Sequence, residues 1–217
     1  CRVAFEDAEV HFLTKLILTA VKLTRTSFEM ESHHMSIVSR ALKEAYLRRA
    51  RERGIVYKDG VLVEGDSTNE VSVSMDDVIA SMSGLTAEGE FETLKEQIED
   101  LITRLMPYYG DGVYAAFFRG QAQTRKQSAK LLYAYDLEAL DSDETLKVLM
   151  SMCVIQEIMT MMSKPESLKR GGVLYIEELG CLGRDNPIVD EFDFDQLPAL
   201  RFVFPHAPMR AVTINAG

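Results

Sequence analysis

The sequence predicts an α/β fold, with helices in the first half of the chain and a parallel sheet in the second half. Two observations support this prediction. Apolar residues recur every three or four positions through most of the first half, as on one face of an amphipathic helix. The second half alternates a short apolar run, a helical stretch of about 20 residues and a second apolar run, which implies a right-handed crossover between parallel strands. The alternative is a mostly α-helical chain with a small sheet.

The composition is that of a globular chain whose charge favours protein partners over bulk nucleic acid. Of the 217 residues, 47% are hydrophobic and 27% are charged, so there is enough apolar material for a core. Lys and Arg number 24 against 34 Asp and Glu, which gives a formal net charge of −10. An acidic chain is a poor general binder of nucleic acid.

The cysteines, the hydropathy and the ends of the chain suggest a compartment. Three cysteines without a CxxC pair argue for a reducing compartment, and against a disulfide framework or a cysteine-ligated zinc site. No apolar run reaches the roughly 18 residues of a membrane-spanning helix, so we expect a cytoplasmic protein without a transmembrane segment. There is no signal peptide before Cys1 and no stop-like tail at Gly217, so we expect a piece of a larger protein.

Two amphipathic helices are predicted before residue 54. The second ends at Gly54, a natural stop, and carries an arginine cluster in its last turns, where cations suit the helix dipole. We interpret this cluster as a solvated helix end, and a phosphate or DNA contact is the alternative. The apolar positions of the helices are Val10, Leu13, Ile17, Ala20, Val21, Met35, Val38, Leu42, Ala45 and Tyr46, and the cluster is Arg48, Arg49, Arg51 and Arg53.

Turn and capping signals organise the residues that follow. Two β-branched runs around a Lys-Asp-Gly turn predict a hairpin over residues 55–63. Ser74, with Asp77 three positions later, resembles a capping box with Asp in place of Glu. A long amphipathic helix should then end before Pro107, and residues 113–118 should form a short aromatic strand or turn.

Several potentially reactive side chains are interpreted as structural. His33 and His34 are adjacent on a helix, so they should point different ways, and no third metal ligand is evident. His11 lies within an amphipathic helix, and Cys153 should be a core thiol among methionines. The methionines of this stretch, Met150, Met159, Met161 and Met162, should form a core, a helix-packing face or a subunit interface. No GxSxG motif occurs, so no serine hydrolase triad can be assembled.

The strongest local motif is an apolar strand followed by two carboxylates. Residues 173–176 are apolar, and Glu177 and Glu178 come directly after them. This is the pattern of a Walker B strand, whose first carboxylate holds Mg²⁺ and whose second orients or deprotonates the attacking water. An ordinary buried strand that ends at an acidic loop is the alternative. No GxxxxGK[ST] phosphate-binding loop occurs in the 217 residues, so this segment alone should not hydrolyse ATP.

Further motifs resemble one family over roughly residues 1–185. Residues 109–120 (YGDGVYAAFFRG) look like the GxYgxxFxG segment of TraC-type conjugative transfer ATPases, the large ATPases of type IV secretion. The run ending in residues 135–140 (YDLEAL) is similar to that family's vxDLexL strand. The methionine-rich helix and residues 172–178 then fall where the family has a helix and its Walker B strand. The upstream helices, with their SMDDVI segment, suit the family's helical insertion between Walker A and Walker B.

This resemblance implies a partial P-loop NTPase (RecA-like) sheet with a large helical insertion. It places Glu177 at the metal position, in place of the usual Asp, and Glu178 at the catalytic position, with ATP and Mg²⁺ as cofactors. The implied partners are further copies of the protein, as a homo-oligomer, and inner-membrane secretion components, and the parent protein would be cytoplasmic or bound peripherally at that membrane. The parent would couple ATP hydrolysis to DNA or protein transfer or to pilus assembly.

The end of the chain resembles a different family. Residues 197–217 are similar to an early strand and loop of bacterial carboxylesterases of the α/β-hydrolase fold, and His206 would be a loop residue there, not the triad histidine. The seam lies between Gly183 and Gln196, and a frameshift, recombination, assembly error or deliberate fusion could each produce it. We therefore predict a helical insertion over residues 1–107, a partial ATPase core over 108–185 and a tail over 186–217. The tail could be disordered, because a lone hydrolase strand has no sheet to join.

Two other functions stay open beside the ATPase. A carboxylesterase fragment acting on short acyl esters would explain the last residues of the chain and nothing before them. A non-enzymatic helical interaction module would have a surface patch of Met and Leu side chains, and nucleotides would not change its melting temperature.

Overall fold

The computed structural model describes residues 7–24, 29, 31–58, 61–64, 71–86, 91–119, 140 and 142–162. The chain divides into two compact units, Cys1–Asp136 and Leu137–Gly217. The described residues are mostly helical, and the sheet among them has two strands, so the predicted α/β class with a parallel P-loop sheet is wrong for this part of the chain. The apolar runs over 131–135 and 173–176, which were predicted to be strands, lie outside the described residues.

Residues 113–118 are predicted to form an aromatic strand or turn, and they form a turn. They contain a 3₁₀ helix, η3 (Ala115–Phe118), preceded by a turn in which the Tyr114 N–H donates to the Pro107 carbonyl at 2.8 Å. A short apolar run has the same composition in a strand and in a buried turn, and its periodicity does not distinguish them. The strand half of that prediction is therefore wrong.

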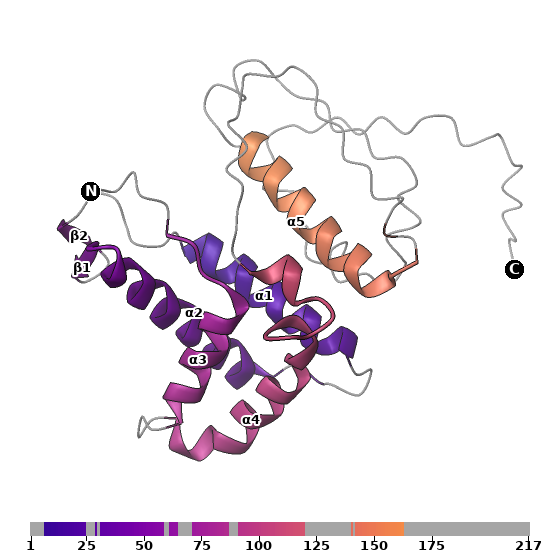
Figure 1. Cartoon of the computed structure of the whole chain (residues 1–217), viewed down its shortest axis with the longest axis horizontal. Helices are drawn as coiled ribbons and strands as arrows, with labels where there is room; N and C mark the ends of the chain where they lie inside the picture. Colours follow the sequence, from indigo (N-terminus) through magenta and orange to yellow (C-terminus); the bar gives the residue numbers. More distant parts are fainter. Residues whose placement is uncertain are drawn as a thin grey trace, which may run out of the picture. The chain divides into compact units, whose positions relative to one another are not determined.

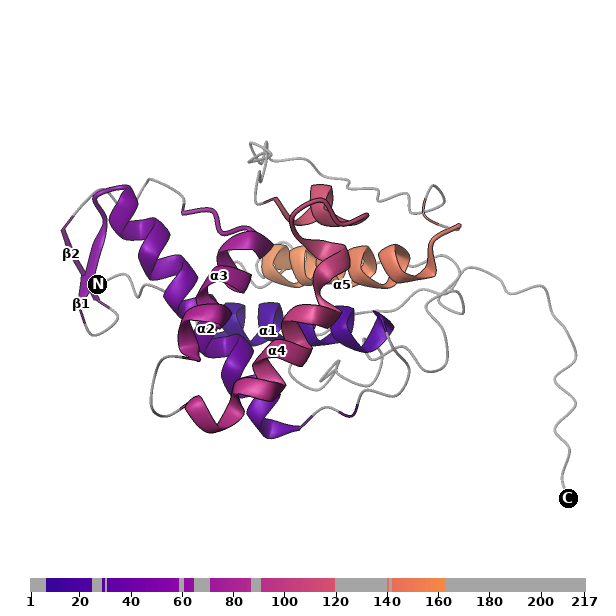
Figure 2. The ribbon, with the colours of Figure 1, turned by 60° about the horizontal axis from the view of Figure 1, so that its bottom comes forward.

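The described residues of the first unit contain four α-helices. Helix α2 contacts both α1 and α3, and α4 contacts α1 and α3 (Figures 1 and 2). The hairpin of β1 and β2 extends from the C-terminal end of α2 (Figure 1). The elements are α1 (Asp7–Thr24), α2 (Ser32–Glu52), β1 (Val56–Lys58), β2 (Val61–Glu64), α3 (Met75–Leu85), η1 (Glu92–Leu94), α4 (Lys95–Arg104), η2 (Met106–Tyr108) and η3.

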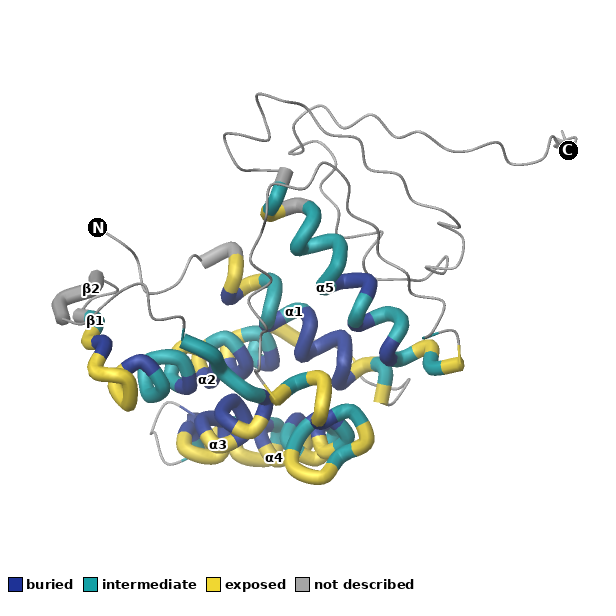
Figure 3. The backbone as a smooth tube through the Cα atoms, turned by 45° about the horizontal axis from the view of Figure 1, so that its top comes forward, coloured by how far each residue is buried: buried dark blue, intermediate teal, exposed yellow. Residues whose placement is uncertain are grey.

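The core of this unit lies along one face of α2, α3 and α4, whereas α1 is buried on all sides over residues 16–21 (Figure 3). In α2, Ala41 and Ala45 are fully buried, and their small side chains let the neighbouring helices approach closely. Burying a large aliphatic side chain contributes about 1.5–3 kcal/mol. Other core residues include Leu16, Ile17, Leu18, Val21, Ile37, Val38, Leu42, Val78, Met82, Ile98, Leu101 and Leu105. The predicted amphipathic helices of the first half are thus confirmed.

The predicted hairpin after α2 is also confirmed. Strands β1 and β2 pair antiparallel, with Tyr57 opposite Leu62. Gly54 precedes them with φ +71, a left-handed conformation that favours glycine and turns the chain out of α2. The hydroxyl groups of Tyr46 and Tyr57 lie 3.4 Å apart, which links the hairpin to α2. Burial, together with the hydrogen bond to Tyr57, raises the pKa of Tyr46 well above its ordinary value.

The segment that follows α4 is a folded part of the core, which we call the 106–118 turn. Helix α4 ends at Arg104, ahead of Pro107, as predicted. Tyr108 is 1% exposed, and its hydroxyl donates a hydrogen bond to the Ala20 carbonyl of α1 at 3.1 Å. Its ring stacks on Tyr114 and meets the edge of Phe118, at centroid distances of 5.3 and 5.5 Å. These contacts attach the turn to α1.

Helix α5 (Glu144–Met162) is the described helix of the second unit. Its predicted start near residues 141–143 is confirmed, because the Asp143 carboxylate accepts a hydrogen bond from the Leu146 N–H at 2.9 Å. Leu149 and Met152 are buried, whereas Cys153, predicted to be a core thiol, is half-buried, and burial raises the pKa of its thiol. None of the described helices is both long and apolar enough to cross a membrane.

Candidate functional site

The carboxylates proposed from the sequence for metal binding and catalysis, Glu177 and Glu178, lie outside the described residues. The same is true of His206 in the carboxylesterase-like tail. Within the described part of the chain, no three His, Cys, Asp or Glu side chains are grouped so that they could hold a metal ion. A candidate site in this part must therefore be sought among other polar side chains.

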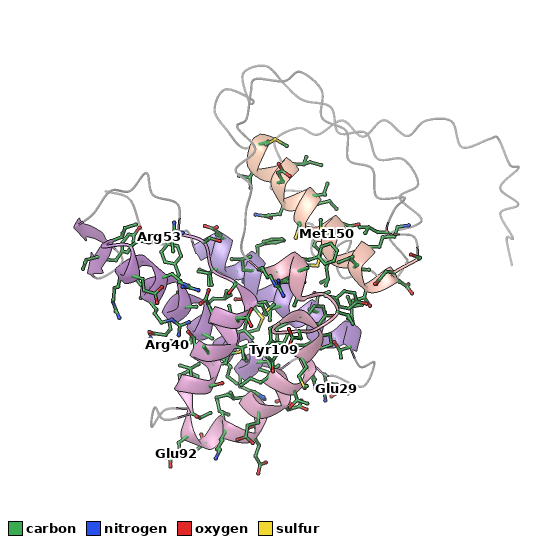
Figure 4. All side chains as sticks on the ribbon, in the orientation of Figure 1. Glu29, Arg40, Arg53, Glu92, Tyr109 and Met150 are labelled. Carbon is green, nitrogen blue, oxygen red and sulfur yellow. The ribbon has the colours of Figure 1, made fainter. Side chains whose placement is uncertain are left out.

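A polar cleft of about 260 Å³ lies at the C-terminal end of α2. Its lining residues come from the C-terminal end of α2, from the start of α3 and the segment just before it, and from the position directly after η3. Arg53, labelled in Figure 4, lies at that end of α2, whereas Arg40 lies further back along the helix. The cleft is lined by Arg49, Glu52, Arg53, Ser72, Ser74, Asp77 and Arg119, and we call it the arginine cleft.

One wall of the cleft is the capping box of α3, and its prediction is confirmed. The Ser74 hydroxyl accepts a hydrogen bond from the Asp77 N–H at 3.3 Å. In return, the Asp77 carboxylate accepts hydrogen bonds from the N–H and the hydroxyl of Ser74, at 3.0 and 2.8 Å. This arrangement satisfies backbone donors that have no partner within the helix. It also fixes the Asp77 carboxylate at the first turn of α3, where negative charge suits the helix dipole.

The arginines of α2 reach this carboxylate across the helix interface. Arg49 forms an ion pair with Asp77, with 2.9 Å between Nη2 and Oδ1. Arg48 donates to the Asp77 carbonyl at 3.0 Å, and its Nη2 lies 3.4 Å from Oδ1. The Asp77 side chain is 9% exposed. The interpretation of the cluster as a solvated helix end is therefore wrong for Arg48 and Arg49, because both are half-buried and paired.

These contacts also set the protonation of the ion pair. Burial raises the pKa of Asp77, but hydrogen bonds from Ser74 and Arg49 outweigh it, so the pKa lies below its ordinary value. The hydrogen bond to Asp77, followed by that to Glu52, raises the pKa of Arg49. Both groups therefore remain charged at neutral pH.

The cleft carries positive charge in an acidic chain. Three guanidinium groups, those of Arg49, Arg53 and Arg119, face it together with the carboxylates of Glu52 and Asp77, which leaves a formal charge of +1. Arg119 is exposed and forms no ion pair with another described residue. The sequence pattern identified Arg49 and Arg53 as members of a cluster, but nothing in it placed Arg119 beside them.

The His33–His34 pair is a second polar group, and its geometry differs from the prediction. The two rings lie 4.1 Å apart, with 3.2 Å between their Nε2 atoms, so they point toward each other. His34 turns back to the start of α2, where its Nδ1 accepts a hydrogen bond from the Glu31 N–H at 3.1 Å. His33 Nδ1 lies 3.3 Å from the Glu31 carboxylate. Side chains of a helix lean toward its N-terminus, which allows His34 to reach this backbone donor.

This network fixes the tautomers of both rings. Because His34 Nδ1 accepts a hydrogen bond from the Glu31 N–H, the proton of the neutral ring sits on Nε2, which donates a hydrogen bond to His33 Nε2. His33 then carries its proton on Nδ1 and donates it to Glu31. Both Nε2 atoms are occupied by the hydrogen bond between the rings, so the pair has no lone pair to offer a metal ion. The interpretation of the pair as packing residues agrees with the burial of His34.

A prediction about pH follows from the position of His34. Burial and then the nearby His33 lower the pKa of His34 from 6.5, and Arg104 acts in the same direction, whereas Glu31 and Asp100 oppose it. The unfolded chain therefore binds a proton at a higher pH than the folded chain does. Stability should fall as the pH drops below 6.5, until the pH passes the folded pKa.

We expect His34→Asn to lose less unfolding free energy than the unmodified chain between about pH 7.5 and pH 5.5, measured by urea denaturation. His11→Asn is the control, because His11 is an exposed histidine of α1 and its replacement should leave the loss intact. An equal loss in the His34 variant and the unmodified chain would contradict the assignment.

Comparisons of the sequence with protein-family models and with curated proteins, and of the structure with solved structures, found no match.

Proposed function

We propose that the chain is part of a conjugative transfer ATPase and that its first unit is the helical insertion of that enzyme. The observation that carries this proposal is the arrangement of residues 7–119, whose described part forms a helical unit with its own core. The motifs that resemble the ATPase lie at its end and beyond it, in residues 109–120, 135–140 and 172–178. In this proposal the unit contacts further copies of the protein or inner-membrane secretion components.

The proposal assigns the chemistry to residues outside the described part. Glu177 would take the position nearest Mg²⁺, and Glu178 would orient or deprotonate the water that attacks the γ-phosphate. Both assignments rest on the resemblance. ATP would also need a phosphate-binding loop, and no GxxxxGK[ST] motif occurs in the 217 residues. In this proposal the activity would belong to a longer protein that supplies the loop upstream.

A non-enzymatic helical interaction module is the second candidate, and exposed apolar side chains favour it. In the 106–118 turn, Met106 is 58% exposed, Val113 79% and Phe117 56%. Large apolar side chains that gather on one exposed segment are typical of protein contact surfaces. This candidate requires no nucleotide.

Activity measurements on the chain joined to its natural upstream segment test the first candidate. We expect ATP hydrolysis that Glu178→Gln lowers by about 10²–10⁴-fold, the range for loss of a general base, while ATP binding persists. Glu92→Gln is the matched control, because Glu92 is an exposed carboxylate of η1 (Figure 4) and its replacement should leave the rate unchanged.

The same preparations distinguish the two candidates. A melting temperature that rises with ATP and Mg²⁺ supports the ATPase. An upstream segment without a phosphate-binding loop, together with a melting temperature that nucleotide does not change, would overturn it and leave the interaction module.

A further inference from the structure

We propose that the arginine cleft binds a phosphate group carried by a small molecule. This inference does not rest on the ATPase assignment, because the cleft lies wholly within the first unit and uses none of the carboxylates proposed for ATP hydrolysis.

The first argument is the geometry of the donors. Arg49 lies in the last turn of α2, and Arg53 directly follows that helix. Arg119 directly follows η3, so guanidinium groups from two separate parts of the chain line one cavity. Ser72 and Ser74 line the same cavity, and the Ser74 hydroxyl donates its hydrogen bond to the Asp77 carboxylate. Guanidinium groups donate hydrogen bonds in a fixed planar arrangement that matches the oxygens of a phosphate.

The second argument is the charge. The whole chain carries −10, yet the side chains that line this cleft carry +1. The Asp77 carboxylate already forms an ion pair with Arg49 and accepts the capping hydrogen bonds of Ser74, so its negative charge is balanced by groups of the protein. Arg119 forms no ion pair with another described residue. A dianion would therefore gain more from this cleft than a neutral or cationic ligand.

The third argument is size and shape. A cavity of about 260 Å³ holds a phosphate group together with a small part of the molecule that carries it. A carboxylate could be satisfied by one arginine, whereas a phosphate monoester has two negative charges and three terminal oxygens for several guanidinium groups. Duplex DNA would need an extended positive surface, which the overall acidic charge disfavours.

Calorimetric titration of the 217-residue chain tests this inference. The probes are inorganic phosphate and adenosine 5′-monophosphate, at constant ionic strength maintained with chloride. We expect saturable binding of one phosphate per chain. Arg119→Gln should weaken it roughly tenfold, the loss expected for one charge-assisted hydrogen-bonding partner. Equal affinities for the two probes would identify free phosphate as sufficient, and tighter binding of the nucleotide would show that the cleft also contacts the rest of the molecule.

Arg51→Gln is the matched control. It removes the same charge from the same end of α2, but Arg51 does not line the cleft, so the affinity should change by less than about twofold. Circular dichroism of both variants checks that the helices remain folded.

Three outcomes would overturn the inference. The first is no saturable binding of either probe up to roughly 10 mM, which lies beyond the weakest useful affinity for such a site. The second is an equal loss of affinity in the Arg119 and Arg51 variants, which would indicate diffuse charge attraction. The third is binding of a DNA duplex without binding of either small phosphate, which would assign the cleft to nucleic acid.

Discussion

Replacing Gly112 by alanine is expected to destabilise the first unit by about 2–3 kcal/mol. A Cβ atom added at this position would collide with the backbone carbonyl oxygens of Met106 and Pro107. Backbone atoms cannot move aside as the end of a flexible side chain can, so the 106–118 turn itself would have to open. The Gly112 N–H donates to the Tyr109 carbonyl at 2.9 Å, and this hydrogen bond would be strained in the process.

The loss of stability in the Gly112 variant should extend beyond the 106–118 turn. Tyr108 anchors the turn to α1, and the Gly110 N–H anchors it to α3 by donating to the Asp76 carboxylate at 2.9 Å. Gly84→Ala is the matched control, because this glycine lies in α3 and an added Cβ meets nothing within 4 Å. Alanine there should stabilise the helix by up to about 1 kcal/mol. Urea denaturation gives both values, and equal stabilities of the Gly112 variant and the unmodified chain would contradict the described turn.

Replacing Asp77 by alanine should cost about 2–3 kcal/mol, because one side chain serves two purposes. It caps α3 through Ser74, and it pairs with Arg49 and Arg48 of α2. Loss of a capping side chain typically costs about 1 kcal/mol. Loss of the ion pairs adds less than for a fully buried pair, because the two arginine side chains are about 40% exposed and solvent screens them.

Asp77→Asn separates the charge from the shape of the side chain. It should retain part of the capping but lose the ion pairs, so its stability should lie between those of the alanine variant and the unmodified chain. Asp111→Asn, which removes an exposed carboxylate, is the control and should change the unfolding free energy by less than about 0.5 kcal/mol.

Acid titration provides an independent check on Asp77. Its pKa is lower in the folded chain, so its contribution is complete above the ordinary pKa of 3.8 and disappears as the pH falls through the folded value. The Asp77→Asn variant should therefore lose less stability than the unmodified chain when the pH is lowered through this range. Parallel losses in the two proteins would show that the carboxylate is not held by these contacts.

Local sequence signals predicted local structure well. The spacing of Val38, Leu42 and Ala45 predicted the buried face of α2, and the Ser74–Asp77 pair predicted the start of α3. These predictions succeed because helix periodicity and capping depend on residues only three or four positions apart. The fold class failed in the described part because it was inferred from the order of short apolar runs, which have no such local constraint.

The candidate site was less predictable, because its contacts join distant parts of the chain. Arg48 and Asp77 are 29 residues apart, and only the packing of α2 on α3 makes them partners. Arg119, which directly follows the 106–118 turn, lines the same cleft. The orientation of His33 and His34 was also mispredicted, although these residues are neighbours in the sequence. Adjacent helix positions point apart on average, and the backbone donor of Glu31 changes the orientation of His34.

The central claim is that residues of α1–α4 and the 106–118 turn form one cooperative helical unit. Native-state hydrogen exchange, followed by mass spectrometry on the 217-residue chain, tests it most directly. We predict that the core amides of α1, α2, α3 and α4 exchange slowly and lose protection together at one denaturant concentration, and that Gly112→Ala lowers the protection of all of them. Independent loss of protection in the separate helices, or protection that the Gly112 substitution leaves unchanged, would contradict the account.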